Sequence, residues 1–366
     1  MELQIAVEEL SRALYRAQGI VEKKSTMPIL ANVLLEATKG TLTVTAFDLE
    51  IGVRSEHKAE VAKEGQLAVS AKHLYDIVRA LGEPMLTLKK AQNNYLELKC
   101  GASQFKIVGM PAEDFPPLPK SEKIPFVTVE PKALLEMIEK TSFAVSTDET
   151  RFNLNGVFFE PSKNGTRMVA TDGHRLTMVE RKLDGDFKLK RGVIIPKKGL
   201  LELKRLLGEE SEGTAELGFI EGAGVFRRPG LTMIMRLIDG HFPDYQHVLP
   251  KESEKIVRLG RQRFLETLKR VSLLSQDQSH TVKIELADGI LRVSSQNPDL
   301  GEAKEELPVE TKGTMQVGFN ARYVIDVLQV ITSEEIRFEL NDELSPGVLK
   351  PQGDEGYTAV IMPVRI

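Results

Sequence analysis

An internal repeat with a period of roughly 120 residues most constrains the fold of this chain. Each third begins with an amphipathic helical pattern, and the predicted helices cover 7–24, 131–141 and 261–271. A strand pair follows each helix, at 29–37 with 41–47, at 156–160 with 168–171, and at 281–286 with 290–295. Each pair turns at an X-Gly dipeptide typical of hairpins: Lys39-Gly40, Asn164-Gly165 and Asp288-Gly289. A second helix in each third is predicted over 71–81, 197–207 and 321–331.

A corner follows the hairpin in every third, and its middle copy is the richest in chemistry. That copy reads Ala170-Thr171-Asp172-Gly173-His174-Arg175-Leu176 between two apolar strand patterns. Taken alone, it is most simply a hairpin bend with one hydrogen-bonded histidine. The stretches 47–50 and 296–299 occupy the equivalent places in the other thirds. This recurrence favours a corner with a function.

The repeat predicts an α+β protein of three domains, each with two helices against an antiparallel sheet. A chain of 366 residues is long enough for two or three domains. Proline-rich tails at 114–119 and 241–250 are followed by charged stretches at 120–123 and 251–255, which we interpret as linkers. The predicted domains are therefore 1–120, 125–250 and 254–366.

Charge is distributed unequally between the predicted helices and the rest of the chain. The six helical spans hold 17 Lys and Arg against 9 Asp and Glu, whereas the whole chain holds 49 against 53. In the first helix, Arg12 and Arg16 lie opposite an apolar face, and Arg263 and Arg270 do so in the third-domain helix. Solvated helix faces are often basic, which is the simpler interpretation. A shared basic surface that attracts the phosphate backbone is the alternative that we favour.

The size of the repeat limits how such a surface could meet duplex DNA. A domain of this length is roughly 35 Å across. Three such domains in a closed ring leave a hole of only ~5 Å, whereas six leave one of ~35 Å. Duplex DNA, roughly 20 Å wide, passes only through the larger hole. Three repeats per chain therefore predict a head-to-tail homodimer that closes a six-domain ring.

Composition and motifs exclude several other classes of protein. Cys100 is the only cysteine, so the sequence predicts no intrachain disulfide and no cysteine metal cluster. The N-terminus has acidic residues where a signal peptide needs basic ones, and we expect a cytoplasmic protein without a membrane span. Phosphate-binding loops, nucleophile elbows and zinc-hydrolase motifs are absent from the sequence. We therefore expect no enzyme activity, cofactor or metal; an enzyme and a scaffold without a DNA role remain the competing classes.

The motifs of the chain also resemble those of a known family. They include Thr26-Met27-Pro28-Ile29-Leu30, Asp48-Leu49-Glu50, Asp114-Phe115-Pro116, Leu154-Asn155-Gly156, the corner 170–176, the stretch 239–245, Gly318-Phe319-Asn320 and Met362-Pro363-Val364-Arg365-Ile366. In this order and spacing they resemble bacterial DNA polymerase III beta subunits, the sliding clamps, over the whole length. The resemblance implies a DNA-clamp fold without catalytic activity. It further implies a processivity factor that encloses duplex DNA without reading its sequence.

The resemblance implies a partner-peptide pocket between the second and third domains. Its positions here are Arg151, Leu154, Thr171, Gly173, His174, Arg175, Leu176, Pro243, His247, Val248, Pro346, Val360, Ile361, Met362, Pro363, Val364 and Arg365. Leu154, Leu176, Val248, Val360 and Met362 would form an apolar floor, and His174 and Arg175 would orient the peptide. His247 stands where relatives often carry Arg, so the charge at the rim is expected to vary with pH. The partners implied are the polymerase III alpha subunit, the clamp-loader delta subunit and other proteins with a clamp-binding peptide.

Two further surfaces follow from the resemblance together with the charge pattern. The predicted DNA-binding residues are Arg12, Arg16, Lys24, Phe152, Asn153, Lys198, Arg263 and Arg270. Phe152 and Asn153 stand where relatives often carry an aromatic pair. The seam of the dimer is predicted at Phe105, Ile107, Leu273 and Leu274. An apolar strand edge at Phe105 and Ile107 would need a partner to avoid aggregation.

Overall fold

The computed structural model describes residues 1–21, 27–119, 124–183, 185–209, 213–250, 253–275, 280–311 and 313–366. The chain forms two compact units. The first contains Met1–Lys132, Asp184–Lys188 and Lys198–Leu237, and the second contains Ala133–Leu183, Leu189–Lys197 and Ile238–Ile366. The middle third of the sequence is thus shared between the units, while the first and last thirds each belong to one.

Antiparallel strands form the frame of the first unit. Thirteen strands in its described part make one sheet, in the order β10-β15-β16-β17-β4-β3-β2-β6-β9-β8-β7-β1-β5. Their bounds are β1 Glu2–Ala6, β2 Asn32–Thr38, β3 Thr41–Phe47, β4 Ile51–Lys58, β5 Glu60–Lys63, β6 Gly65–Ser70, β7 Met85–Lys90, β8 Tyr95–Cys100, β9 Ser103–Met110, β10 Phe126–Val129, β15 Ala215–Ile220, β16 Ala223–Arg228 and β17 Leu231–Arg236. The pairing of β17 with β4 joins the middle third to the first.

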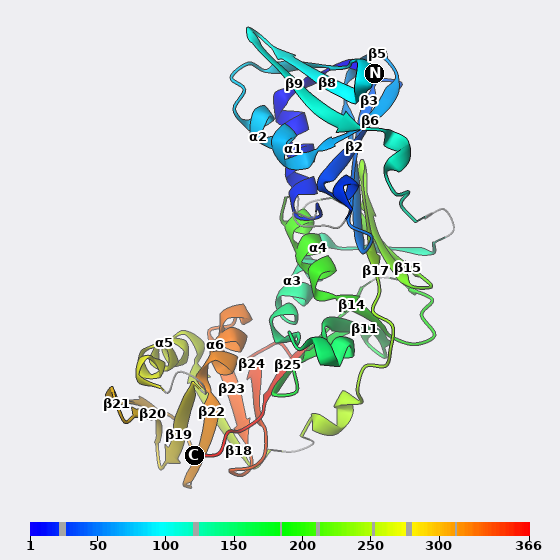
Figure 1. The fold of residues 1–366 in the computed structure, drawn as a ribbon. Coiled ribbons are helices and arrows are strands. Elements are labelled where there is room, and N and C mark those ends of the chain that lie inside the picture. Colours follow the sequence, from blue (N-terminus) through cyan, green and yellow to red (C-terminus); the bar gives the residue numbers. More distant parts are fainter. Residues whose placement is uncertain are drawn as a thin grey trace. The chain divides into compact units, whose positions relative to one another are not determined.

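Helices α1 (Val7–Gln18) and α2 (Ala71–Arg79) pack side by side on the strands of the first third (Figure 1). The predicted apolar face of α1 is confirmed, because Leu10, Ala13, Leu14 and Ala17 are all buried. The helix is shorter than the predicted 7–24: it ends at Gln18, and Gly19 is its C-cap. Glycine is a poor helix former because its backbone loses the most entropy on folding, so an end at this position is expected.

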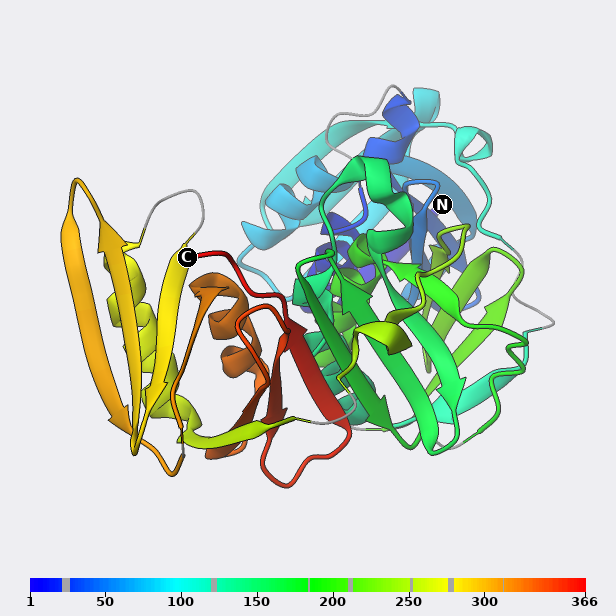
Figure 2. The ribbon, with the colours of Figure 1, turned by 90° about the horizontal axis from the view of Figure 1, so that it is seen from below.

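The second unit has two antiparallel sheets in its described part. The larger sheet has the order β14-β11-β12-β13-β25-β24-β23-β18, and the smaller has the order β21-β20-β19-β22. The bounds are β11 Gly156–Ser162, β12 Gly165–Thr171, β13 Arg175–Arg181, β14 Val193–Pro196, β18 Lys255–Gly260, β19 Thr281–Ala287, β20 Ile290–Asn297, β21 Gly301–Pro308, β22 Met315–Asn320, β23 Glu335–Leu340, β24 Gly347–Pro351 and β25 Tyr357–Ile361. Figure 2 shows β25, in red, beside the green strands of the middle third, which it joins by pairing with β13.

Four further helices complete the three thirds. They are α3 (Pro131–Glu139), α4 (Lys197–Glu209), α5 (Arg261–Val271) and α6 (Ala321–Val330). Figure 2 shows α5, in yellow, on one face of the smaller sheet, where Phe264, Leu268 and Val271 are buried as predicted. The described part of each third therefore holds two α-helices and eight or nine strands, which confirms the predicted repeat unit.

The predicted hairpins are also confirmed, with one change. Gly40 and Gly289 have φ of 82° and 80°, a left-handed conformation that glycine adopts without steric cost. The strand predicted over 29–37 begins three residues later, because Pro28–Ala31 form a short 3₁₀ turn. Proline lacks the N–H that a strand ladder uses, and it fits the first turn of a helix.

No helix in the described ranges is both long and apolar enough to span a membrane.

Candidate functional site

A cavity of about 660 Å³ lies in the second unit, where β13 meets β25. Its walls come from the end of η5 (Glu149–Leu154), the corner between β12 and β13, η6 (Tyr245–Val248), the loop before β24, and the end of β25. The lining residues are Leu154, Thr171, Gly173, Arg175, Leu176, Pro243, Asp244, Tyr245, His247, Val248, Leu249, Pro250, Asn341, Ser345, Pro346, Val360 and Met362. Residues from the second and third thirds of the sequence thus form one site.

The floor of this cavity is apolar because of strand register. Leu176 on β13 pairs with Val360 on β25, and Val360 pairs with Val348 on β24. These three side chains, with Val169 and Tyr245, form one buried hydrophobic cluster. Three neighbouring strands therefore present apolar side chains to the same place, which gives a ligand a site to bury hydrophobic groups.

The corner between β12 and β13 is held by its own polar side chains. Asp172 Oδ1 accepts the backbone N–H groups of His174 and Arg175, both at 3.0 Å. Thr171 Oγ1 accepts the N–H of Gly173 at 3.1 Å and donates to the carbonyl of Arg175 at 2.7 Å. Gly173 has φ of 90°, and a Cβ there would lie 2.8 Å from Nη1 of Arg151. The positive φ therefore favours glycine at this corner, whereas the Arg151 atom is the end of a flexible side chain that can move away.

Arg175 lines the cavity, and its guanidinium is held in place by groups of the protein itself. Its Nε donates to Asp172 Oδ2 at 3.1 Å, its Nη1 to Asp326 Oδ2 at 2.6 Å and its Nη2 to the carbonyl of Phe143 at 2.8 Å. The guanidinium also lies 4.5 Å from the ring centroid of Tyr323. With every nitrogen engaged and two carboxylates nearby, the charge of Arg175 is already balanced.

His174, next to Arg175, is exposed. Its ring stacks on Tyr323 with centroids 6.3 Å apart, and its carbonyl accepts the N–H of Met362 at 2.9 Å. The imidazole does not line the cavity, whereas the backbone of His174 positions a residue that does.

Tyr245 anchors the η6 wall from below. Its hydroxyl donates to the Glu160 carboxylate and accepts from Arg167 Nη1 at 2.8 Å, while Arg167 Nη2 also donates to Glu180 at 2.6 Å. Burial and the hydrogen bond to Glu160 raise the pKa of Tyr245 to about 12. The phenol is therefore neutral at physiological pH and holds the segment that carries His247 and Val248.

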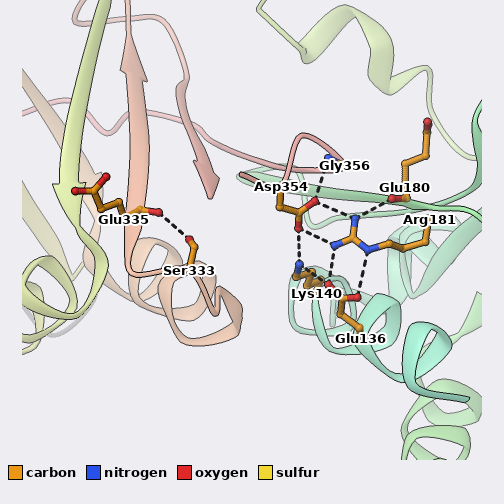
Figure 3. A network of polar contacts seen from close by, with 8 residues as sticks. All are labelled: Glu136, Lys140, Glu180, Arg181, Ser333, Glu335, Asp354 and Gly356. Carbon is orange, nitrogen blue, oxygen red and sulfur yellow. Dashed lines mark hydrogen bonds and ion pairs between the residues drawn. The ribbon is translucent and has the colours of Figure 1, made fainter. Parts of the chain in front are cut away.

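The other end of the β13–β25 pairing is secured by a network of four charged side chains (Figure 3). Arg181 Nη2 lies 2.6 Å from Glu136 Oε1 and 2.7 Å from Asp354 Oδ2. Lys140 Nζ bridges the same two carboxylates, at 2.6 Å from Glu136 and 2.8 Å from Asp354. The network joins α3 and β13 to the turn between β24 and β25, so it fixes the register that builds the cavity floor.

Eleven of the predicted pocket residues line the cavity: Leu154, Thr171, Gly173, Arg175, Leu176, Pro243, His247, Val248, Pro346, Val360 and Met362. Six do not: Arg151, His174, Ile361, Pro363, Val364 and Arg365. Ile361 is fully buried, because side chains alternate along β25 and its neighbours Val360 and Met362 take the cavity side. Arg151 forms an ion pair of 3.0 Å with Asp148.

Six lining residues are additional to the predicted set: Asp244, Tyr245, Leu249, Pro250, Asn341 and Ser345. Asp244 and Tyr245 belong to the motif 239–245 and lie close in sequence to His247, so the sequence could have indicated that they line the cavity. Asn341 and Ser345 lie in the loop between β23 and β24, which carries no sequence pattern that points to the cavity.

The predicted DNA-binding residues have different environments in the two units. The prediction that Arg16 is an exposed cation is wrong. Its side chain is 8% exposed, and its Nε lies 2.7 Å from Oε2 of Glu209 on α4. Lys198 forms an ion pair with Asp48, and Arg12 pairs with Glu8 and Glu9 on its own helix. Lys24 lies outside the described residues.

The remaining DNA-binding candidates belong to the second unit. Arg263 is exposed, whereas Arg270 pairs with Glu305 at 2.7 Å. Phe152 is exposed, and Asn153 Nδ2 donates to the carbonyl of His241 at 3.0 Å. The structure therefore holds Asn153 in place and leaves Phe152 and Arg263 open to solvent.

The predicted seam residues are apolar and accessible in their own units. Phe105 and Ile107 lie on β9, which pairs with β8 along its length but with β6 only at Gly109 and Met110. The outer edge of β9 at Ser103–Val108 therefore has no strand partner among the described residues. Leu273, in η7 (Ser272–Leu274) of the other unit, is 77% exposed, and Leu274 is half-buried.

Comparison with family models covers nearly all of the chain. Residues 1–119 match the N-terminal domain of the DNA polymerase III beta subunit, residues 128–244 match its central domain, and residues 246–365 match its C-terminal domain.

Individual relatives agree with the family models. The beta sliding clamp of Pseudomonas putida is 35% identical over 368 residues, and that of Caulobacter vibrioides is 34% identical over 373 residues, each with full coverage of both chains. The structure of the Pseudomonas aeruginosa subunit has a TM-score of 0.95 at 33% identity, with full coverage of both chains. A Bartonella birtlesii clamp bound to griselimycin has a TM-score of 0.96 at 32% identity, also with full coverage. This chain belongs to the DNA polymerase III beta subunit family, the beta sliding clamps, which are non-catalytic processivity factors.

Proposed function

We propose that this chain works as a head-to-tail homodimeric ring that encloses duplex DNA in the cytoplasm and tethers DNA polymerases through the cavity whose floor includes the paired strands β13 and β25. The expected occupants of the cavity are short peptides of the polymerase III alpha subunit, the clamp-loader delta subunit and other DNA-processing proteins. The observation that carries this proposal is the apolar cavity of about 660 Å³. Its volume lies in the range of small-ligand sites and fits two or three side chains of an extended peptide.

The chemistry of the cavity favours a peptide with large apolar side chains. Leu176, Val248 and Val360 offer hydrophobic surface, and the polar groups nearby already have partners within the protein. We expect binding of a peptide with a Gln, then a Leu, and a terminal Leu-Phe pair. Burial of two such side chains contributes roughly 3–6 kcal/mol before ordering costs, so the affinity should be micromolar.

Ring closure is supported by two unpartnered edges in the described chain. β9 presents an open edge at Ser103–Val108, and β21 is the outer strand of the smaller sheet. The exposed Leu273 precedes this sheet in η7, which packs against β20 and β21. We propose that β9 of one subunit pairs with β21 of the other, with Phe105 and Ile107 packed on Leu273 and Leu274. Pairing of both edges would bury apolar side chains and satisfy backbone groups at once.

The peptide site is tested with a fluorescent peptide of the stated sequence. We expect micromolar binding to the full chain and none to a variant truncated after Ile361, which lacks the Met362 wall. A variant that lacks only Ile366 is the matched control, because Ile366 does not line the cavity. Equal affinity of the full chain and the longer truncation would exclude this cavity as the peptide site.

Enclosure of DNA is tested on closed circles. A ring loaded onto a circle should remain bound in salt that removes it from the same DNA after linearisation, since charge contacts weaken with salt while topology does not. Sequence-specific protection in a footprint would contradict the proposal, because enclosure contacts phosphates rather than base edges.

A further inference from the structure

Strand β22 ends in Gly318-Phe319-Asn320, a motif whose residues all lie outside the cavity lining. Phe319 is fully buried, and its ring centroid lies 5.7 Å from that of Phe338 in the third-domain core. Asn320 accepts the N–H of Arg322 at 2.9 Å and so caps α6. These two neighbours fix Gly318 in place between the core and a helix start.

The C-terminal segment lies directly against Gly318. The carbonyl of Gly318 accepts the N–H of Val364 at 2.8 Å, and the two residues form an isolated antiparallel bridge. A Cβ on Gly318 would lie 2.5 Å from the carbonyl oxygen of Val364 and 2.6 Å from Cγ2 of Ile366. Real Cβ contacts are not this short, and the first of these atoms is backbone. Any side chain at Gly318 therefore displaces the C-terminal segment.

The same segment is held at its other end by the corner described above. The N–H of Met362 donates to the carbonyl of His174 at 2.9 Å, and Ile361 just before it is fully buried and paired with Arg175. A hydrogen bond therefore holds each end of the segment 362–364: Met362 bonds to His174, and Val364 bonds to Gly318. Met362, the one residue of this segment that lines the cavity, lies between the two attachments. Its position depends on both of them.

We propose that Gly318 is a positioning residue for the peptide site: its missing side chain lets residues 362–364 bind across the edge of β22 and sets Met362 as a wall of the cavity. This inference rests on the proposed function of the cavity. The residue acts through the C-terminal segment and does not contact the peptide.

The first test compares Gly318→Ala with Gly260→Ala. Gly260 is the matched control because it lies in the same third, and a Cβ there meets no atom within 4 Å. Hydrogen exchange of the Val364 amide is measured without any ligand. Gly318→Ala should accelerate this exchange at least about tenfold, because it removes the bond to the Gly318 carbonyl, whereas Gly260→Ala should not. Unchanged exchange in Gly318→Ala overturns the inference.

The second test measures peptide affinity in a double-mutant cycle. Gly318→Ala should raise the Kd of the fluorescent peptide about tenfold in the full chain. A chain that ends at Pro363 lacks both groups that the new methyl would meet but keeps Met362, so it should bind weakly. In that shortened chain Gly318→Ala should have no further effect. An equal loss in both backgrounds would mean that the substitution acts through the fold of β22, and would overturn the inference.

The two tests separate this inference from the function on which it rests. If the unmodified chain fails to bind the peptide, the proposed function fails, while the exchange of Val364 still reports whether Gly318 holds the segment. If the unmodified chain binds and Gly318→Ala binds equally well, the positioning role alone is wrong.

Discussion

Nη1 of Arg175 lies 2.6 Å from Oδ2 of Asp326, so an ion pair joins the corner of the middle third to helix α6 of the last third. The arginine side chain is only 9% exposed, and Asp172 and the Phe143 carbonyl occupy its other nitrogens. The corner that lines the peptide cavity is therefore fixed by a residue 151 positions further along the chain. The integrity of the site depends on packing between thirds as much as on its own loop.

The first prediction concerns this ion pair. Asp326→Asn should lower the free energy of unfolding by about 1 kcal/mol, since Asp326 is 36% exposed and solvent screens part of the interaction. Peptide affinity should fall as well, because the corner is less well fixed. Denaturant unfolding and peptide titration measure the two effects. Asp186→Asn, which removes an exposed pair with Lys188, is the control and should change neither.

Stability at acid pH should depend on the network in Figure 3. The hydrogen bond from Arg181 lowers the pKa of Glu136. Burial alone would raise the pKa of Asp354, but the bonds from Lys140 and Arg181 bring it below its ordinary value. Groups with a lowered folded-state pKa stabilise the fold above their ordinary pKa values of 4.5 and 3.8, and this stability is lost as pH falls through the folded values.

The measurement is the unfolding midpoint between pH 6 and pH 3. The double variant Glu136→Gln, Asp354→Asn should be less stable at pH 6 and should lose less on acidification than the unmodified chain. Parallel pH profiles of the two proteins would show that these carboxylates do not contribute to acid unfolding.

Tyr245 should make the fold less stable as the pH rises into the alkaline range, the opposite direction to the carboxylate network. Its pKa rises from 10.0 to about 12 in the folded chain, so its contribution to stability is complete below pH 10 and is lost between about pH 10 and 12. Tyr245→Phe should remove this alkaline step and lower stability at pH 7 by roughly 1–2 kcal/mol, because Glu160 and Arg167 lose a buried partner. Unfolding at several pH values tests it, and an unchanged alkaline step would assign the step to another group.

Arg16 and Arg263 should behave differently on DNA. Arg263 is exposed, so Arg263→Ala should reduce the slope of log affinity against log salt by about 1. Arg16→Ala should leave that slope unchanged and instead destabilise the fold by roughly 1–2 kcal/mol, since Glu209 loses its 2.7 Å partner but keeps Arg205 at 3.5 Å and Arg228 at 3.8 Å. If Arg16→Ala lowered the slope of log affinity against log salt while the protein kept its full stability, Arg16 would contact DNA after all.

The proposed seam predicts a monomer when its apolar residues are charged. Leu273→Asp with Leu274→Asp should give a folded monomer by light scattering, because two carboxylates would be buried without partners at the interface. Leu344→Asp is the matched control: Leu344 is 75% exposed but lies in the loop beside the peptide cavity, so this variant should remain dimeric. A dimer that survives the double substitution would place the seam elsewhere.

Much of the fold was predictable from local patterns. The hairpin turns at Gly40 and Gly289 follow from the conformational freedom of glycine, and the helix faces of α1 and α5 follow from spacing alone. The predicted helix 7–24 extended past the end of α1, because apolar residues continue after Gly19, although glycine itself disfavours a helix. Eleven residues of the cavity lining were predicted from family motifs. The loop residues Asn341 and Ser345 were not predicted, because no motif marks them.

The sequence by itself determined the threefold repeat, the type of each element and the basic character of the helices, because these depend on residues a few positions apart. Only the tertiary structure decided which charges remain exposed and which are paired. Arg16 has the same helical spacing as Arg12, yet α4 brings Glu209 to it from 193 positions away. Arg175 is likewise paired with a residue distant in sequence, since α6 brings Asp326 to a corner that already holds Asp172. Partners so distant in sequence are set by strand register and helix packing, which no local pattern contains.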